Sequence, residues 1–80
     1  MNNLLDLTAR ELQVLELIVE GFTDDEIASR LYVTKDTINT HRKKIKHKLQ
    51  VTNVAAMVAK AFRLGLIKSL ALLVTGYSSL

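Results

Sequence analysis

Apolar residues recur at helical spacing from the start of the chain. Leu12, Leu15 and Val19 fall three or four residues apart, so they share one face of a helix. Gly21 follows this run and suits the left-handed residue that closes a helix. The pattern predicts a first helix from Ala9 to Glu20.

Threonines mark the helix starts. Thr8 lies three residues before Glu11, and Thr23 lies three residues before Glu26. Both pairs fit a capping box, in which a hydroxyl and a carboxylate satisfy the free amides of a first helical turn. The second pair predicts a short helix from Asp24 to Leu31.

Two more helices complete the pattern. Thr34 is an N-cap for a helix from Lys35 to Leu49. Thr52 or Asn53 caps a fourth helix, which ends near Leu64 with a glycine behind it. The chain has 80 residues and no Pro. We therefore predict an all-α fold of four helices in one small domain.

The second and third helices are separated by only three residues, "YVT". So short a link forces a sharp turn, with Val33 pointing inward. Two helices joined this tightly, the second longer and basic, match a helix-turn-helix. Because structural bundles also contain short helical hairpins, the spacing alone favours DNA binding only weakly.

The third helix has one apolar edge and one polar edge. With about 100° per residue, Ile45 and Leu49 return to within about 20° of Ile38, which makes this edge the core face. The opposite edge is wholly polar and carries Asp36, Asn39, Thr40, Lys43, Lys44 and His47.

Charge is divided along the chain. Residues 1–33 hold two basic and seven acidic residues, a net charge of −5, whereas residues 34–49 hold six basic and one acidic residue, a net charge of +5. Concentrated positive charge attracts polyanions, although a solvated charged face would look the same. No acidic residue follows Asp36 in the third helix, so phosphate would relieve repulsion among its basic side chains.

The polar edge offers side chains that can read DNA. Asn39, Thr40 and Lys43 lie in the first two turns, where a recognition helix touches base edges, and their groups suit adenine, thymine and guanine respectively. At the flanks of this edge are side chains placed for phosphates, which set register without reading sequence: Lys35, Thr37, Lys46 and Lys48.

Several classes of function are not expected. There is no Cys, and His41 and His47 point too far apart around the helix to bind one ion, so we expect no metal or other cofactor. No nucleophile, base and orienting group occur together, which argues against an enzyme. The N-terminus lacks a signal-peptide pattern and the apolar run at residues 70–74 is too short for a membrane span, which predicts a cytoplasmic protein.

The sequence resembles the LuxR/GerE-type helix-turn-helix domains of bacterial transcription regulators. The resemblance covers Leu7 to Ile67 and rests on the order of LTxRE, VLxL, Gly, EIAxxL, VxxxT(I/V)xxH, IxxKL and GLI. It implies a four-helix domain that binds duplex DNA through the third helix, with no small-molecule ligand. It also implies base contacts from Asn39, Thr40 and Lys43, and backbone contacts from Thr23, Thr34, Thr37 and Lys48.

Three positions depart from the family pattern. Asp25 stands where Lys is frequent, Val54 where a basic residue is common, and Asn39 where Lys is frequent on the reading face. These changes imply that affinity rests more heavily on the third helix.

The fourth helix is the expected dimer interface. We predict that Val54, Val58 and Ala61 are buried within the domain, while small side chains elsewhere permit close approach of a second copy: Ala55, Ala56 and Ala59. The alternative is that these alanines merely favour the helix.

The resemblance divides the chain into a DNA-binding domain, residues 1–67, and an apolar tail, residues 68–80. The tail either forms an extra C-terminal helix, extends a dimer interface or stays partly disordered, and we expect it to pack. The chain is either a stand-alone regulator or a fragment without its sensing domain. The alternative function is a protein-interaction module of the transcription machinery, like the helical units of sigma factors that contact RNA polymerase.

Overall fold

Four helices follow one another in the computed structural model, which describes residues 7–66. They are α1 (Ala9–Val19), α2 (Asp24–Leu31), α3 (Lys35–Leu49) and α4 (Val54–Arg63). No strand occurs within these residues. The predicted all-α fold and the bounds of α2 and α3 are confirmed, whereas α1 ends one residue earlier than predicted because Glu20 is its C-cap.

Both predicted capping boxes are present. The amide of Glu11 donates to Thr8 Oγ1 at 3.0 Å, and the amide of Thr8 donates to Glu11 Oε1 at 2.9 Å. The same reciprocal bonds join Thr23 and Glu26 at 3.2 and 2.9 Å. These bonds involve residues three positions apart, so the start of each helix is set by its local sequence.

Side chains also cap the other two helices. Thr34 Oγ1 accepts the amide hydrogen of Thr37 at 3.1 Å, which starts α3 as predicted. Asn53 Oδ1 accepts the amide hydrogen of Ala56 at 2.8 Å. Asn53, and not Thr52, is therefore the N-cap of α4.

Left-handed residues follow all four helices. Gly21 and Gly65 have φ of 96° and 77°, as expected of glycine behind a helix. Tyr32 and Gln50, the C-caps of α2 and α3, have φ of 59°. The sequence did not predict these two, since non-glycine residues adopt this conformation at a cost of roughly 1–2 kcal/mol.

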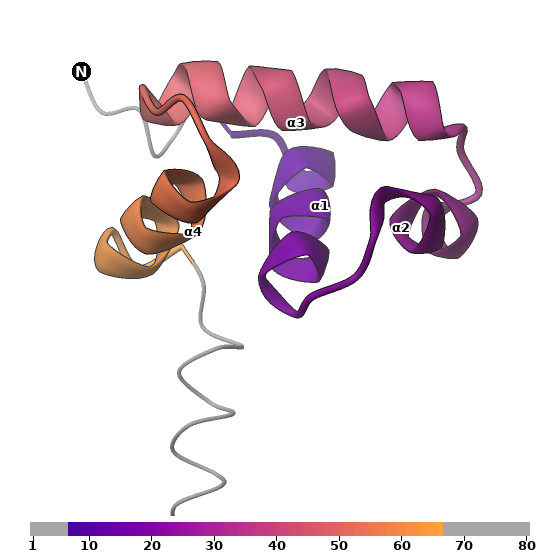
Figure 1. Ribbon diagram of the computed structural model, residues 1–80, viewed down its shortest axis with the longest axis horizontal. Coiled ribbons are helices and arrows are strands. Elements are labelled where there is room, and N and C mark those ends of the chain that lie inside the picture. Colours follow the sequence, from indigo (N-terminus) through magenta and orange to yellow (C-terminus); the bar gives the residue numbers. More distant parts are fainter. Residues whose placement is uncertain (1–6, 67–80) are drawn as a thin grey trace, which may run out of the picture.

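Helix α3 lies across the other three (Figure 1). In this view α3 runs along the top, α1 lies below its middle, and α2 and α4 stand on either side of α1. Ile38 and Ile45 are fully buried and Leu49 is 1% exposed, so the predicted core edge of α3 is confirmed. The core contains Leu7, Val14, Leu15, Ile18, Ile27, Ala28, Ile38, Ile45, Leu49, Met57 and Ala61.

The core face of α4 differs from the prediction. Ala61 is buried as predicted, but Val54 and Val58 are only half-buried. Met57, four residues before Ala61, is fully buried as well. Because positions four apart lie on one face of a helix, Met57 and Ala61 together define the inward direction of α4.

Two expectations concern the chain ends and the membrane. The extra C-terminal helix, one of the alternatives for residues 68–80, lies outside the described residues. Between residues 7 and 66, no helix is long and apolar enough to cross a membrane.

Candidate nucleic-acid interface

The edge of α3 that faces away from the core carries exposed polar side chains. Asn39, Thr40 and Lys43, the predicted base-reading residues, are all exposed on it. The same edge exposes Asp36, Lys44 and His47. Burial of Ile38 and Ile45 on the opposite edge of the helix turns these polar side chains outward. The three predicted base readers therefore share one accessible face.

The side of α3 next to α2 carries two ion pairs. Arg42 Nη2 bonds Asp24 Oδ1, and both side chains are largely buried, at 19% and 24% exposed. Lys35 Nζ lies 3.8 Å from Asp25 Oδ1, and these side chains are 63% and 77% exposed. Lys35 and Arg42 are seven residues apart, which places them on the same side of the helix. The acidic first turn of α2 thus partly neutralises this side of α3.

The side of α3 next to α1 carries a buried ion pair. Lys48 Nζ lies 2.8 Å from Glu11 Oε1, and the Glu11 side chain is only 4% exposed. The same oxygen accepts the amide hydrogen of Thr8. Lys48, a predicted phosphate ligand, therefore has a partner inside the domain.

Several neighbours determine the pKa of Glu11. Burial of the carboxyl raises this pKa, but the hydrogen bonds from Lys48 and from the Thr8 amide, with the charges of Lys48 and His41, lower it. The net effect holds the pKa of Glu11 below its ordinary value. The carboxylate is thus kept charged by the contacts that attach α1 to α3.

His41 lies at the edge of the core. It is half-buried, and its Nδ1 atom is buried without a hydrogen-bond partner among the described residues. His47 is exposed on the outward edge. No group of three or more potential metal ligands occurs between residues 7 and 66.

Three lysines of α3 retain unpaired charge. Within residues 7–66, no ion pair involves Lys43, Lys44 or Lys46. Lys43 and Lys44 are exposed and Lys46 is half-buried. We call these three the free lysines; all lie in the carboxyl-terminal half of α3, so the positive charge available to a polyanion is concentrated there.

The predicted phosphate-binding threonines sit at helix starts. Thr23 and Thr34 cap α2 and α3 through their hydroxyl oxygens. Thr37 Oγ1 lies 3.0 Å from Thr34 Oγ1, so these two hydroxyls share a hydrogen bond. A hydroxyl has one proton and two acceptor lone pairs, and the free amides of a first turn favour anions. These positions are therefore compatible with phosphate contacts from both helix starts.

Sequence reasoning missed the acidic partners of α3. Within α3 no acidic residue follows Asp36. The partners of Arg42 and Lys48 are Asp24 of α2 and Glu11 of α1. A usable signal was present, because both acids lie in the first turns of helices with predicted capping boxes.

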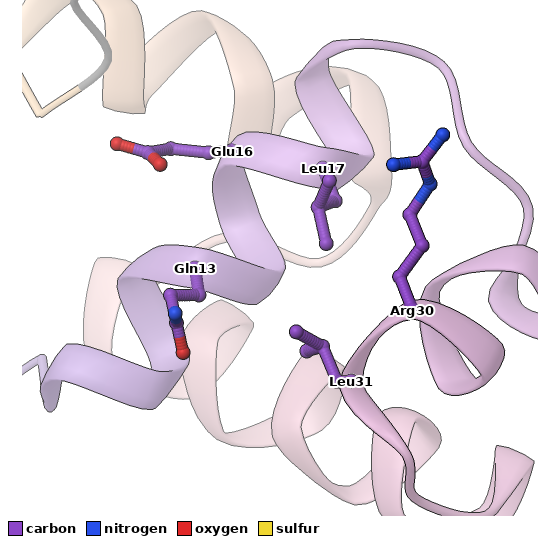
Figure 2. A pocket seen from close by; sticks show the side chains of 5 residues that line it. All are labelled: Gln13, Glu16, Leu17, Arg30 and Leu31. Carbon is purple, nitrogen blue, oxygen red and sulfur yellow. The ribbon is translucent and has the colours of Figure 1, made fainter.

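A shallow hollow lies away from these side chains, between α1 and α2 (Figure 2). Its volume is about 280 Å³, and it is lined by Gln13, Glu16, Leu17, Arg30 and Leu31. Leu17 and Leu31 point toward one another across it. Arg30 packs over the Phe22 ring at 4.0 Å from its centre. The lining residues offer no nucleophile and base pair.

Comparison with known proteins places this arrangement among bacterial regulators. The model of the family described as "Bacterial regulatory proteins, luxR family" matches residues 5–61. The transcriptional regulatory protein MctR of Rhizobium johnstonii is 43% identical over 61 residues, which are 76% of this chain and 28% of MctR.

Two solved structures show the same helical arrangement. The transcription factor GerE aligns with a TM-score of 0.73 and 26% identity, over 76% of this chain and 91% of GerE. The response regulator ChrA of a heme-sensing two-component system aligns with a TM-score of 0.73 and 33% identity, over 76% of this chain but 30% of ChrA. The chain thus spans less than a third of the length of MctR or ChrA.

Proposed function

The chain belongs to the luxR family of bacterial regulatory proteins, and from this premise we propose that it regulates transcription by placing α3 in the major groove of duplex DNA. The observation that carries the proposal is the exposed edge of α3, where Asn39, Thr40 and Lys43 stand free of the core. A helix fits the major groove, where every base pair presents a distinct set of donors and acceptors.

The three exposed residues divide the recognition of bases. Asn39 can pair bidentately with adenine, Thr40 can contact the thymine methyl group, and Lys43 can donate to guanine. Asn39 and Lys43 are four residues apart and so lie one above the other on the helix. Together the three side chains would read adjacent base pairs.

Phosphate contacts would fix the helix in the groove. We assign them to Lys46 and Lys35 on the α2 side, to Thr37 and Lys48 on the α1 side, and to the caps Thr23 and Thr34. Of the three lysines assigned to phosphate, Lys35, Lys46 and Lys48, only Lys46 has no acidic partner among residues 7–66. Lys48 contributes through a side chain that Glu11 already orients.

A homodimer formed through α4 would bind two half-sites. Ala55 and Ala59 are exposed and Ala56 is half-buried, so the outer side of α4 has small side chains that permit close approach. Phe62, at 48% exposed, and Leu64, at 38%, add apolar surface beside them. Two copies related by a two-fold axis would read half-sites about one helical turn of DNA apart, or a multiple of it.

We expect the protein to act by occupying its operator, without catalysis and without a cofactor. The DNA-binding domain spans residues 1–67 in this proposal. Contact with RNA polymerase is a further expectation, for which the hollow between Leu17 and Leu31 offers an accessible surface. A pull-down of polymerase that persists after nuclease treatment would support this second interaction.

Selection of binding sites from random duplex DNA tests the proposal. The full chain is used at near-physiological salt with competitor DNA, and the winning sequence is then titrated with salt. An enriched motif with two-fold symmetry is the expected result. Weak binding without any enriched motif would contradict sequence-specific readout.

A further inference from the structure

Two neighbouring carboxylates of α2 hold two basic residues on one side of α3. Asp24 bonds Arg42, and Asp25 faces Lys35 with 3.8 Å between Oδ1 and Nζ. Phosphate oxygens and carboxylate oxygens compete for the same cationic donors. On this side of α3, the two carboxylates therefore pair with basic side chains that a DNA phosphate strand would otherwise contact.

The two pairs differ in how readily they open. The side chains of Asp24 and Arg42 are 24% and 19% exposed, and the guanidinium is hydrogen-bonded in the helix interface. The side chains of Asp25 and Lys35 are 77% and 63% exposed and their closest atoms are at the long end of ion-pair distances. An exposed pair of this kind is weak and screened by salt, so Lys35 can exchange partners while Arg42 stays in place.

We propose that Asp25 is a built-in competitor for DNA phosphate. It holds Lys35 in the free protein and is displaced from it when a phosphate strand binds beside α3. The inference rests on the proposed function and deepens it. Once displaced, the Asp25 carboxylate remains close to the phosphates and repels them, so it lowers affinity for every DNA sequence alike.

Asp25 changes which basic residues of α3 make the first contacts with DNA phosphates. With Lys35 held by Asp25 and Arg42 held by Asp24, the charge that meets phosphate first comes from the free lysines Lys43, Lys44 and Lys46. Because phosphate contacts carry no sequence information, Asp25 weakens specific and non-specific binding by the same factor and leaves their ratio unchanged.

The test uses a double-mutant cycle on random-sequence duplex DNA. Binding of the full chain and of the Asp25→Asn, Lys35→Gln and doubly substituted chains is measured between about 50 and 200 mM salt. Glu16→Gln, the same charge change at an exposed position on α1, is the matched control. Circular dichroism of each variant checks that the four helices persist.

The expected result is a specific coupling between the two positions. Asp25→Asn should tighten binding by about twofold to fivefold, the range set by an exposed ion pair. It should also steepen the salt slope by up to about 0.9, because no carboxylate is left to take up a cation on binding. In the Lys35→Gln background the same substitution should tighten binding by less than about twofold.

Three outcomes would overturn the inference. Equal tightening with and without Lys35 would show that Asp25 acts only through net charge. Equal tightening by Glu16→Gln would show the same. No tightening by Asp25→Asn would show that Asp25 does not compete with phosphate. If the unchanged protein binds no duplex even at the lowest salt, the proposed function fails as well, which distinguishes that case from failure of the inference alone.

Discussion

Lys48 Nζ lies 2.8 Å from Glu11 Oε1, an ion pair that joins the last turn of α3 to the first turn of α1. The Glu11 side chain is 4% exposed, so removal of the lysine would leave a carboxylate with little access to water. This relationship separates Lys48 from the free lysines Lys43, Lys44 and Lys46, because loss of Lys48 would destabilise the fold as well as change DNA binding.

Lys48→Met should therefore destabilise the domain. We expect a loss of about 1.5 to 3 kcal/mol in the free energy of unfolding, since a largely buried charged acceptor loses its donor. Urea denaturation measures the change. Lys43→Ala is the matched control and should leave stability nearly unchanged, and Glu11→Gln in the Lys48→Met background should recover part of the loss. A Lys48→Met domain as stable as the unchanged one would contradict this role.

Acid should weaken the same contact. Because the pKa of Glu11 in the folded domain lies below its ordinary value of 4.5, its ionised form contributes stability that is present above that pH. The contribution is lost as the pH falls below 4.5 and through the pKa of the folded state. Unfolding of Glu11→Gln and of the unchanged chain, compared from neutral to acidic pH, should show a stability difference that shrinks on acidification. A constant difference would argue against the assignment.

Lys43 and Lys46 should affect DNA binding differently. Lys43→Ala removes a proposed base contact, so it should cost about 1 to 3 kcal/mol on the selected site and much less on random DNA. Lys46→Ala should weaken binding to both and flatten the salt slope by about 0.9. Fluorescence anisotropy over a range of salt measures both effects. If both variants lost the same affinity on the selected site and on random DNA, the assignment of Lys43 to bases and Lys46 to phosphates would be wrong.

The two left-handed C-caps offer a route to higher stability. Tyr32 is 94% exposed and has φ of 59°, so its replacement loses little packing. Tyr32→Asn should raise the free energy of unfolding by about 0.5 to 1 kcal/mol, because Asn adopts this conformation more readily. Gln50→Gly, at the end of α3, should act in the same direction. Thermal unfolding tests both, and a lower midpoint for both variants would show that strain is absent.

Dimerisation through α4 predicts a separate phenotype. Ala59→Glu places a charge on the exposed side of this helix and should prevent two copies from approaching. We expect loss of the dimeric complex on DNA with two half-sites, with unchanged binding to a single half-site. Sedimentation and gel-shift measurements distinguish these states, and Gln13→Glu on α1 is the control. Retention of the dimeric complex would place the interface elsewhere.

Helix positions could be predicted because their determinants are local. Thr8 and Thr23 each bond a residue three positions away, so the sequence alone contains both partners of each capping box. The outward direction of Asn39 likewise follows from the apolar edge of its own helix.

Contacts between helices could not be predicted in the same way. Glu11 and Lys48 are 37 positions apart, and no periodicity within either helix indicates that they meet. Met57 was missed as a core residue because the depth of each face of α4 depends on where α1 and α3 lie. Tyr32 adopts a positive φ although it is not glycine, since the short link between α2 and α3 leaves the turn little alternative.

The oxygen that Thr8 and Lys48 share has a consequence for motion. Glu11 Oε1 accepts from the residue before α1 and from the last turn of α3, so a single carboxylate oxygen links the two ends. Amide hydrogen exchange in these two segments should then occur through one common opening, with one opening free energy. The carboxyl-terminal end of α3 is thereby tied to the start of α1.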